Sequence, residues 1–434
     1  MCVATSESGL FFHTCLGCEP RPMVPALFVL SSTLSLNVRY SICTTTRRSR
    51  RDAAITMMAS VGPLEGKFVY DARTPLSSSF GQAIETAGPN DPAWGGDLAA
   101  EATAAVSAVQ RAMQLCNALR CEMQTVEANP TSGKTMDACD TQAGVSFIKP
   151  GDDTPVTAAD FAIQGLVAAA LKDQFPADRF MGEEDAGDLR GDAALRSLAL
   201  RLCNEHGGER SEEAFLAAVD SGREPPRGKG ERTWVLDPID GTKGFMTGEG
   251  FVIGLALVDA DGYALLGVMG VPPEEESPPI MAAVRGHGLR WWTAEGTAPV
   301  TYEPPKPAWA ARPELSAPWL ISPQKASAVC KPFGTLEPSV VCCGAMIKYF
   351  QVAAGRHVGF IQYEEELKAW DHACGLICVD ESGGRATDAE GGQVAFDGRQ
   401  FAVKGGIVCA SRWAVEGQRQ ALLKAARRPG TEPE

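Results

Sequence analysis

Three clusters of acidic residues stand where carboxylates can do chemistry, each at the end of an expected strand or the start of an expected helix. They are Gly182-Glu183-Glu184-Asp185, Asp237-Pro238-Ile239-Asp240-Gly241-Thr242 and Trp370-Asp371-His372-Ala373. Taken singly, the first is more often a solvated turn, and Asp371 is more often a helix N-cap. Carboxylates are hard oxygen ligands that suit Mg²⁺, so the three clusters together predict a magnesium site.

The central cluster is the most specific of the three. Its D-x-x-D spacing across a proline-stiffened turn can aim both carboxylates and the Ile239 carbonyl into one cleft. Gly241 and Thr242 open the next expected helix, where backbone N–H groups can bind a phosphate oxygen. Metal and phosphate would therefore share one binding site.

Hydrophobic periodicity indicates the elements that position these clusters. An amphipathic helix is expected from Leu98 to about Met123, and a second from Ala158 to Leu171 with Thr157 as its N-cap. Short strands are expected at Thr233–Leu236, Phe251–Val258 and Tyr263–Val268, and helical runs at Met346–Ala354 and Asp371–Glu381. This mixture of strands and helices predicts an α/β protein.

The predicted organisation has two lobes after an N-terminal extension. Residues 96–270 form an α+β lobe that carries the metal site, and residues 271–425 form an α/β lobe before a tail at 426–434. Residues 58–95 are rich in Gly, Pro and Ser, which is typical of a linker. Residues 1–57 are predicted to be a targeting leader.

The leader prediction rests on composition. Residues 1–57 are rich in Ser and Thr, contain no Lys and carry six Arg against three acids, as transit peptides do. The apolar stretch 23–30 also fits a secretory signal or the first half of a bipartite plastid signal, and a mis-assigned start upstream of Met57 or Met58 is the third reading. A transit peptide would direct the chain to a plastid or mitochondrion; otherwise we expect a cytoplasmic protein.

Overall charge restricts the class of partner. The formal net charge is −14, which argues against capture of a nucleic-acid polymer. No segment is apolar for long enough to predict a secure transmembrane helix. An anionic small-molecule substrate would need a cation-rich site to overcome the acidic surface. The 14 Cys are expected to be reduced thiols, without a zinc site.

The motif set resembles that of a known family. Gly182-Glu183-Glu184, the D-P-I-D-G-T hexapeptide, Trp370-Asp371 and a downstream Glu381-Ser382-Gly383-Gly384 are similar to the inositol monophosphatase-like, lithium-sensitive phosphatases. The segments 153–160, 182–190 and 234–245 narrow the resemblance to the 3′(2′),5′-bisphosphate nucleotidases. It covers roughly residues 96–425, and it implies a layered αβαβα sandwich with the active site between the lobes.

The resemblance also implies roles for individual residues. Two or three Mg²⁺ would be bound, one by Glu183, Asp237 and the Ile239 carbonyl, one by Asp237, Asp240 and Asp371, and a weaker third one beside Glu183 and Asp160. The family mechanism is in-line displacement by a metal-activated water, whose proton the Thr242 hydroxyl and Asp160 take. The substrate would contact Gly241, Thr242, Lys348 and Asp371.

The implied reaction is conversion of 3′-phosphoadenosine 5′-phosphate to AMP and phosphate, a step connected with sulfur assimilation, with inhibition by lithium. Two positions depart from the family pattern, because Ala345 stands for the usual Ser and Gln362 for the usual Arg. Lys348 is the remaining candidate donor, with Arg356 or His357 as replacements; a lone Lys on a helix surface fits Lys348 equally well. Inositol phosphates stay open as substrates, as does a catalytically silent phosphonucleotide sensor, and the oligomeric state is open.

Overall fold

The computed structural model describes residues 55–61, 64–70, 96–128, 146–148, 155–223, 231–248, 250–273, 277–312, 316–321, 336–341 and 344–427. The chain divides into two units, Met1–Gln82 and Ala83–Glu434. In the first unit, β1 (Ile55–Val61) and β2 (Leu64–Tyr70) form an antiparallel hairpin. Most of the expected leader, most of the expected linker and the tail after Arg427 lie outside the described residues.

A six-stranded sheet forms the first half of the second unit. Its strands are β5 (Arg179–Gly182), β6 (Thr233–Asp240), β7 (Val252–Val258), β8 (Ala264–Gly270), β9 (Ile280–Val284) and β10 (Gly288–Trp292), in the order β10-β9-β8-β7-β6-β5. Only β5 and β6 pair in parallel. Because β8 pairs directly with β9, the sheet continues past Gly270, where the sequence placed the boundary between lobes.

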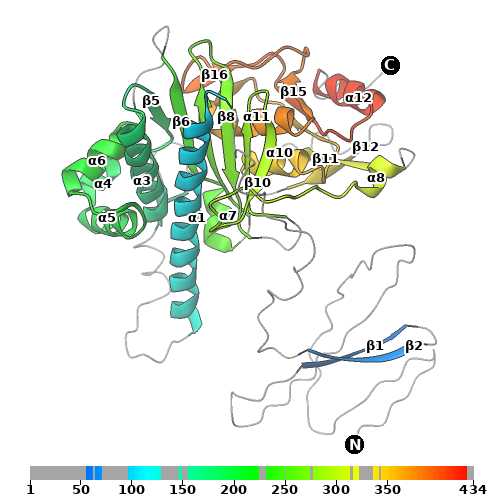
Figure 1. Ribbon diagram of the computed structural model, residues 1–434, viewed down its shortest axis with the longest axis horizontal. Helices are drawn as coiled ribbons and strands as arrows, with labels where there is room; N and C mark the ends of the chain where they lie inside the picture. The colour runs from blue at the N-terminus through cyan, green and yellow to red at the C-terminus, as the bar shows by residue number, and fades with distance from the viewer. Residues whose placement is uncertain are drawn as a thin grey trace, which may run out of the picture. The chain divides into compact units, whose positions relative to one another are not determined.

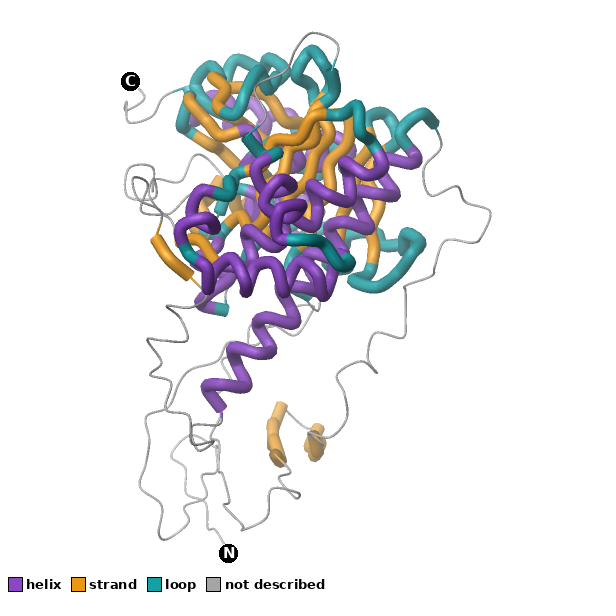
Figure 2. Tube along the Cα trace, turned by 90° about the vertical axis from the view of Figure 1, so that its left-hand side faces the viewer, coloured by secondary structure: helices purple, strands orange, loops and turns teal. Residues whose placement is uncertain are grey.

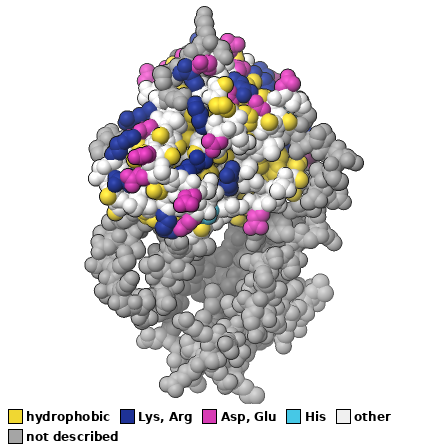
Figure 3. All heavy atoms as spheres, turned by 60° about the vertical axis from the view of Figure 1, so that its left-hand side comes forward, with side chains coloured by type: hydrophobic (Ala, Val, Ile, Leu, Met, Phe, Trp, Pro, Cys, Tyr) yellow, Lys and Arg dark blue, Asp and Glu magenta, His cyan; other side chains and the backbone are white. Residues whose placement is uncertain are grey.

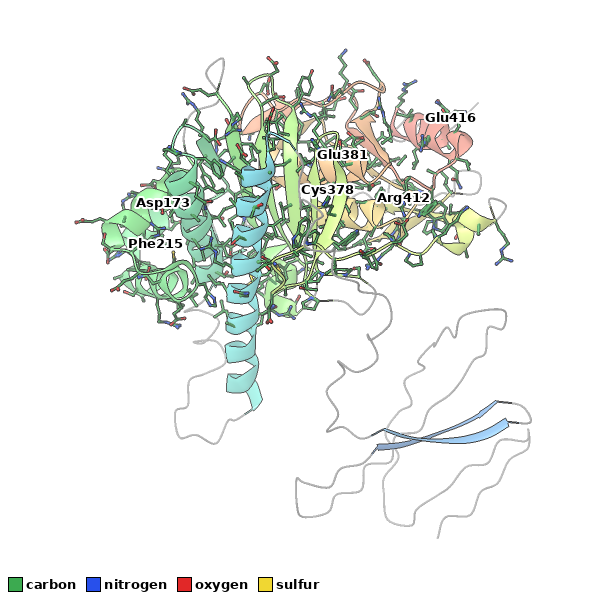
Figure 4. All side chains as sticks on the ribbon, in the orientation of Figure 1. Asp173, Phe215, Cys378, Glu381, Arg412 and Glu416 are labelled. Carbon is green, nitrogen blue, oxygen red and sulfur yellow. The ribbon has the colours of Figure 1, made fainter. Side chains whose placement is uncertain are left out.

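Helices cover one face of this sheet (Figures 1 and 2). Helices α1 (Ala99–Ala128) and α3 (Ala158–Gln174) lie on the sheet, whereas α5 (Ala193–Gly207) and α6 (Glu212–Asp220) pack on α3, and α4 (Gly187–Gly191) packs on α5. Helix α1 packs on β7 to β9 and α3 packs on β6, so their apolar faces and the strands bury one continuous core. Phe215, labelled in Figure 4, anchors α6 in that core. A short ladder of β3 (Ser146–Ile148) and β4 (Pro155–Thr157) precedes α3.

A five-stranded sheet forms the second half. Its strands are β11 (Ala317–Ile321), β12 (Leu336–Val340), β13 (Gly359–Gln362), β15 (Arg385–Asp388) and β17 (Ile407–Ala410), in the order β12-β11-β13-β17-β15. Helix α12 (Glu416–Ala426) packs on β13 and β17, and α8 (Ala308–Ala311) lies in the segment before β11. A separate pair, β14 (Glu366–Lys368) with β16 (Gln400–Ala402), leads into the 3-10 helix η2 (Ala369–Asp371).

Helices α10 (Met346–Ala353) and α11 (Ala373–Glu381) lie between the two sheets. A side chain at Gly267 on β8 would come within 2.6 Å of Ile377 on α11, so this glycine allows the helix to approach the sheet closely. Cys378 of α11, labelled in Figure 4, donates to the Gly267 carbonyl at 3.6 Å. The layers therefore run helix, sheet, helix, sheet, helix, and the predicted αβαβα sandwich is confirmed.

Most of the predicted elements are present, with several shifted boundaries. The N-cap of α3 is Thr157, as expected. Strand β6 does not end in a turn at Leu236, because it pairs with β7 as far as Asp240 and absorbs the Pro238 region as an irregularity in register. Helix α11 begins at Ala373 because Asp371 belongs to the preceding η2.

Charged side chains are mixed on the described part of the surface that Figure 3 shows. Lys and Arg alternate there with Asp and Glu, so the negative charge of the chain is not gathered into one patch on this face. None of the helices in the described part of the chain has the length and apolar character needed to cross a membrane.

Candidate metal centre

Three carboxylates from separate parts of the chain meet where β6 approaches η2. Asp237 and Asp240 lie at the end of β6, and Asp371 is the last residue of η2. One oxygen from each lies within 4.8 Å of the others. Asp237 is 1% exposed and Asp240 is 7% exposed, whereas Asp371 is half-buried, so water reaches this acidic group only from the side of Asp371.

Burial and mutual repulsion make this acidic group costly when all its members are charged. Burial raises the pKa of Asp237 well above its usual value, and the carboxylates of Glu183, Asp240 and Asp371 raise it further. Burial, with repulsion from Asp240 and Glu183, also raises the pKa of Asp371. The group is built entirely from hard oxygen donors, and a divalent cation would remove the repulsion. These residues therefore fit a hard divalent metal ion.

The carboxylate of Asp240 is held by the start of α10. Its two oxygens accept the backbone N–H groups of Ala345 at 2.9 Å and Met346 at 2.6 Å. Gly344 has a φ of 86°, and a side chain there would overlap the Asp240 carboxylate. A glycine is therefore needed for α10 to bind this carboxylate, and the contact fixes the middle helical layer to β6.

Glu183 lies beside the acidic group but is not among the three mutually close carboxylates. It directly follows β5, whose last residue, Gly182, pairs in parallel with Leu236, the residue before Asp237. Its Oε1 lies 3.6 Å from the Lys368 ammonium. Parallel pairing therefore brings Glu183 to the same end of these strands as Asp237, with which the resemblance implies that it shares a metal ion.

Asp160 and Thr242, the predicted proton acceptors, each make a local hydrogen bond. The Oδ2 of Asp160 accepts the backbone N–H of Thr157 at 2.8 Å and the Thr157 hydroxyl at 2.7 Å, which closes the capping box of α3. Its negative charge contributes to the raised pKa of Asp237. Thr242 opens α7 (Thr242–Thr247), and its hydroxyl donates to the Ile239 carbonyl at 3.0 Å. That hydroxyl therefore keeps its lone pairs for another donor.

Lys348 is buried rather than exposed on the surface of α10, so the interpretation as a surface lysine was wrong. Only 3% of it is exposed, its ammonium donates to the Gly344 carbonyl, and it lies 5.4 Å from the centroid of Phe360. Burial lowers its pKa, and the carboxylates of Asp240, Asp371 and Glu364 oppose that shift. Its charge therefore faces the acidic group.

The two positions that depart from the family pattern also lie near this lysine. Ala345 uses its backbone N–H to bind Asp240. Gln362 donates from Nε2 to Glu364 at 2.7 Å. Arg356, considered as a replacement donor, donates to the Ser277 hydroxyl at 2.8 Å. At the position where a cationic donor was expected, Gln362 therefore contacts an acidic acceptor, Glu364.

A cavity of about 540 Å³ opens at Trp370, the residue before Asp371. It is lined by Lys368, Trp370, Asp397, Gly398, Arg399 and Gln400. Lys368, Glu364 and Arg399 could not be recognised from the sequence, because none belongs to a recognisable motif; Lys368 and Arg399 reach the site through contacts with Glu183, which is distant in the sequence. In the sequence, only the family motif Trp370-Asp371 indicated that this region belongs to the site.

Comparison with known proteins gives one family. A model described as the inositol monophosphatase family matches residues 99–428. A 3′(2′),5′-bisphosphate nucleotidase of Emericella nidulans is 30% identical over 309 residues, which cover 61% of this chain and 86% of that protein. One of Oryza sativa is 29% identical over 377 residues, covering 76% and 94%.

Two further matches are a relative whose name gives a location and a solved structure. An Arabidopsis thaliana protein, whose assigned name carries the same activity and a mitochondrial location, is 30% identical over 336 residues, covering 68% of this chain and 79% of that protein. Among solved structures, an IMPase of Thermotoga maritima is 18% identical with a TM-score of 0.46, covering 74% of this chain and 96% of that one.

Proposed function

Because this chain belongs to the inositol monophosphatase family, we propose that it is a metal-dependent phosphomonoester hydrolase, a 3′(2′),5′-bisphosphate nucleotidase that converts 3′-phosphoadenosine 5′-phosphate to AMP and phosphate. Family membership implies metal-dependent catalysis. The observation that carries the proposal is the buried group of Asp237, Asp240 and Asp371, whose oxygens lie within 4.8 Å of one another. The names of the relatives in Emericella nidulans and Oryza sativa support the substrate.

The metal is proposed to be Mg²⁺, with two ions and a weaker third. Glu183, Asp237 and the Ile239 carbonyl would hold one, and Asp237, Asp240 and Asp371 another. Asp160 and Glu183 would border the third. When bound, the ions supply positive charge that stabilises the phosphoryl oxygens and lowers the pKa of the attacking water.

The protein's own residues handle the proton and the substrate. The Thr242 hydroxyl donates to the Ile239 carbonyl at 3.0 Å, so its lone pairs can accept a hydrogen bond from the attacking water. To relay the water's proton, the hydroxyl would turn its own hydrogen from Ile239 to the Asp160 carboxylate, which would end as the proton acceptor. Gly241, Thr242 and Asp371 would contact the phosphate that leaves. Lys348 would attract the second phosphate, because it is the buried cation next to the acidic group.

The test is phosphate release from 3′-phosphoadenosine 5′-phosphate, measured with Mg²⁺ and with chelator. We expect turnover only with Mg²⁺; equal rates under the two conditions would refute the metal mechanism. Asp240→Asn should abolish turnover while leaving the circular dichroism spectrum unchanged, because Asn retains an oxygen for one of the two N–H groups of α10. A catalytically silent phosphonucleotide sensor would bind the nucleotide and release no phosphate.

A second candidate function is that of an inositol mono- or polyphosphate 1-phosphatase. The observation that favours it is the contact between Gln362 and Glu364, which replaces a cationic donor for a second phosphate with a neutral amide and an acid. Losing one charge-assisted hydrogen bond costs about 1.5–3 kcal/mol, or roughly one to two decades in specificity. We therefore expect the nucleotidase activity to have a raised KM.

We also propose that residues 1–57 direct the chain to a mitochondrion or plastid. The support is their Arg-rich, Lys-free composition and the mitochondrial name of the Arabidopsis relative. A reporter fused to residues 1–57 should enter an organelle, and the N-terminus of the mature protein should lie after Arg51. A uniform cytosolic signal with Met1 intact would contradict the proposal.

A further inference from the structure

Arg399 contacts the backbone on both sides of the acidic group. Its guanidinium donates to the Gly182 carbonyl at 2.9 Å, to the Gly222 carbonyl, and to the Glu183 carbonyl at 3.4 Å. The fork geometry of a guanidinium lets one side chain reach several acceptors at once. Arg399 therefore binds the segment that carries Glu183.

The same residue also binds the segment that carries Asp371. Its guanidinium carbon lies 4.5 Å from the ring centroid of Trp370. Its backbone carbonyl accepts the N–H of Ala369 at 2.8 Å, next to the pairing of β14 with β16. Arg399 is thus joined to η2 by its backbone and by its side chain, one residue away from Asp371.

The end of β5 needs such support. This strand is at the edge of the six-stranded sheet, where it pairs with β6 on one side and makes a single antiparallel bridge, Met181 with Arg223, on the other. Beyond β5, Gly182 is held on its outer side by a backbone bond to Gly222 at 3.2 Å. The carbonyls of an edge strand need donors from elsewhere, and Arg399 supplies them.

We propose that Arg399 is a positioning residue that holds the Glu183 carboxylate toward Asp371 and thereby sets the metal affinity of the site. The inference rests on the proposed function, because it takes Glu183 as a ligand. Arg399 touches neither metal nor substrate in this account; it acts through the backbone of Glu183 and the indole of Trp370.

Arg412 offers a matched control. Its guanidinium carbon also lies 4.5 Å from an indole, that of Trp413, and it pairs with Glu303. It comes from the loop between β17 and α12, where Figure 4 labels it together with Glu416. Arg412→Met therefore removes a stacked arginine of the same kind without removing any contact to Glu183 or η2.

The experiment is a double-mutant cycle on the full chain, read out as Mn²⁺ binding to the chelator-stripped protein by calorimetry, without substrate. Arg399→Met should raise the Kd for Mn²⁺ by about tenfold to a hundredfold, the range expected for loss of charge-assisted hydrogen bonds. Arg412→Met should change it by less than about twofold. In a Glu183→Gln background, Arg399→Met should change the Kd by less than about twofold, because the ligand that it positions is already gone.

Each outcome has one meaning. Unchanged Mn²⁺ binding in Arg399→Met, or an equal loss with and without Glu183, would overturn the positioning role. If Arg399→Met does not fold, Arg399→Lys keeps the charge without the fork and should give the same pattern with a smaller loss. Absence of Mn²⁺ binding in the wild type, or a Glu183→Gln variant that binds normally, would instead refute the proposed metal site.

Discussion

Removal of the metal should make the stability of this protein fall as pH rises. In the absence of a cation, burial and the neighbouring carboxylates raise the pKa of Asp371 from 3.8 to about 8. The folded state then binds a proton that the unfolded state releases above pH 4. The contribution of Asp371 to stability is therefore most favourable below pH 4 and becomes progressively less favourable until the pH passes about 8.

The size of this effect follows from the shift. The interval between the unfolded pKa of 3.8 and pH 7 is 3.2 pH units, and the free energy of unfolding decreases throughout it. At about 1.4 kcal/mol for each unit, Asp371 alone costs about 4 kcal/mol at pH 7. A chain of this size loses roughly 2 °C in Tm for each kcal/mol, so the chelated protein should melt about 8 °C lower at pH 7 than at pH 4 from this group alone.

The assay compares Tm with Mg²⁺ and with chelator from pH 5 to pH 8, so that groups common to both states cancel. The difference should widen as pH rises. Asp371→Asn should raise the Tm of the chelated protein at pH 8, because it removes a buried charge. Asp380→Asn is the control: this carboxyl is also buried with a raised pKa, but it binds the Ala386 N–H, and its loss should leave the Mg²⁺-dependent difference unchanged. A difference that stays flat with pH would refute the reasoning.

Three further predictions concern turnover. Asp160→Asn should lower kcat by roughly 10²-fold or more because it removes a proton acceptor, whereas Asp192→Ala, which removes the N-cap of α5, should cost about 1 kcal/mol of stability and leave kcat near wild type; equal effects on kcat would contradict the catalytic role. Gln362→Arg should improve kcat/KM for 3′-phosphoadenosine 5′-phosphate by about tenfold. The gain should be clearest when Glu364→Gln is added, because Glu364 accepts from Gln362 at 2.7 Å and would pair with the new guanidinium. No gain in either the single or the double variant would show that other residues bind the second phosphate. Lithium at roughly tens of millimolar should slow phosphate release, because a monovalent ion supplies half the charge needed at the leaving oxygen; an unaffected rate would show that the second site differs.

Features that depend on short stretches of chain could be predicted from the sequence. The capping box joins Thr157 to Asp160 three residues later, and α3 begins where that pattern places it. The Asp237–Thr242 hexapeptide lies at the end of a buried strand, as its apolar approach indicates. The resemblance implied that Glu183 and Asp237 share a metal ion, and the parallel pairing of β5 with β6 brings the two residues to the same end of these strands.

Features that depend on partners far away in the sequence could not be predicted. Asp240 is bound by the N–H of Ala345, which is 105 residues away, and Gly182 is bound by Arg399, which is 217 residues away. Nothing in the local pattern around Lys348 distinguishes a buried lysine from one on the surface, because its burial depends on the strand that packs against α10. The end of β6 was misplaced for the same reason, since its pairing with β7 overrides the local effect of Pro238.

The central claim is that the buried acidic group serves a metal-dependent hydrolysis of a bisphosphate nucleotide. Its most direct test is kcat/KM measured side by side with Mg²⁺ for 3′-phosphoadenosine 5′-phosphate, inositol 1,4-bisphosphate and inositol 1-phosphate. We expect the nucleotide to be the best substrate, by a margin of roughly one to two decades less than an intact set of phosphate donors would give. A higher kcat/KM for either inositol phosphate would contradict the nucleotidase assignment.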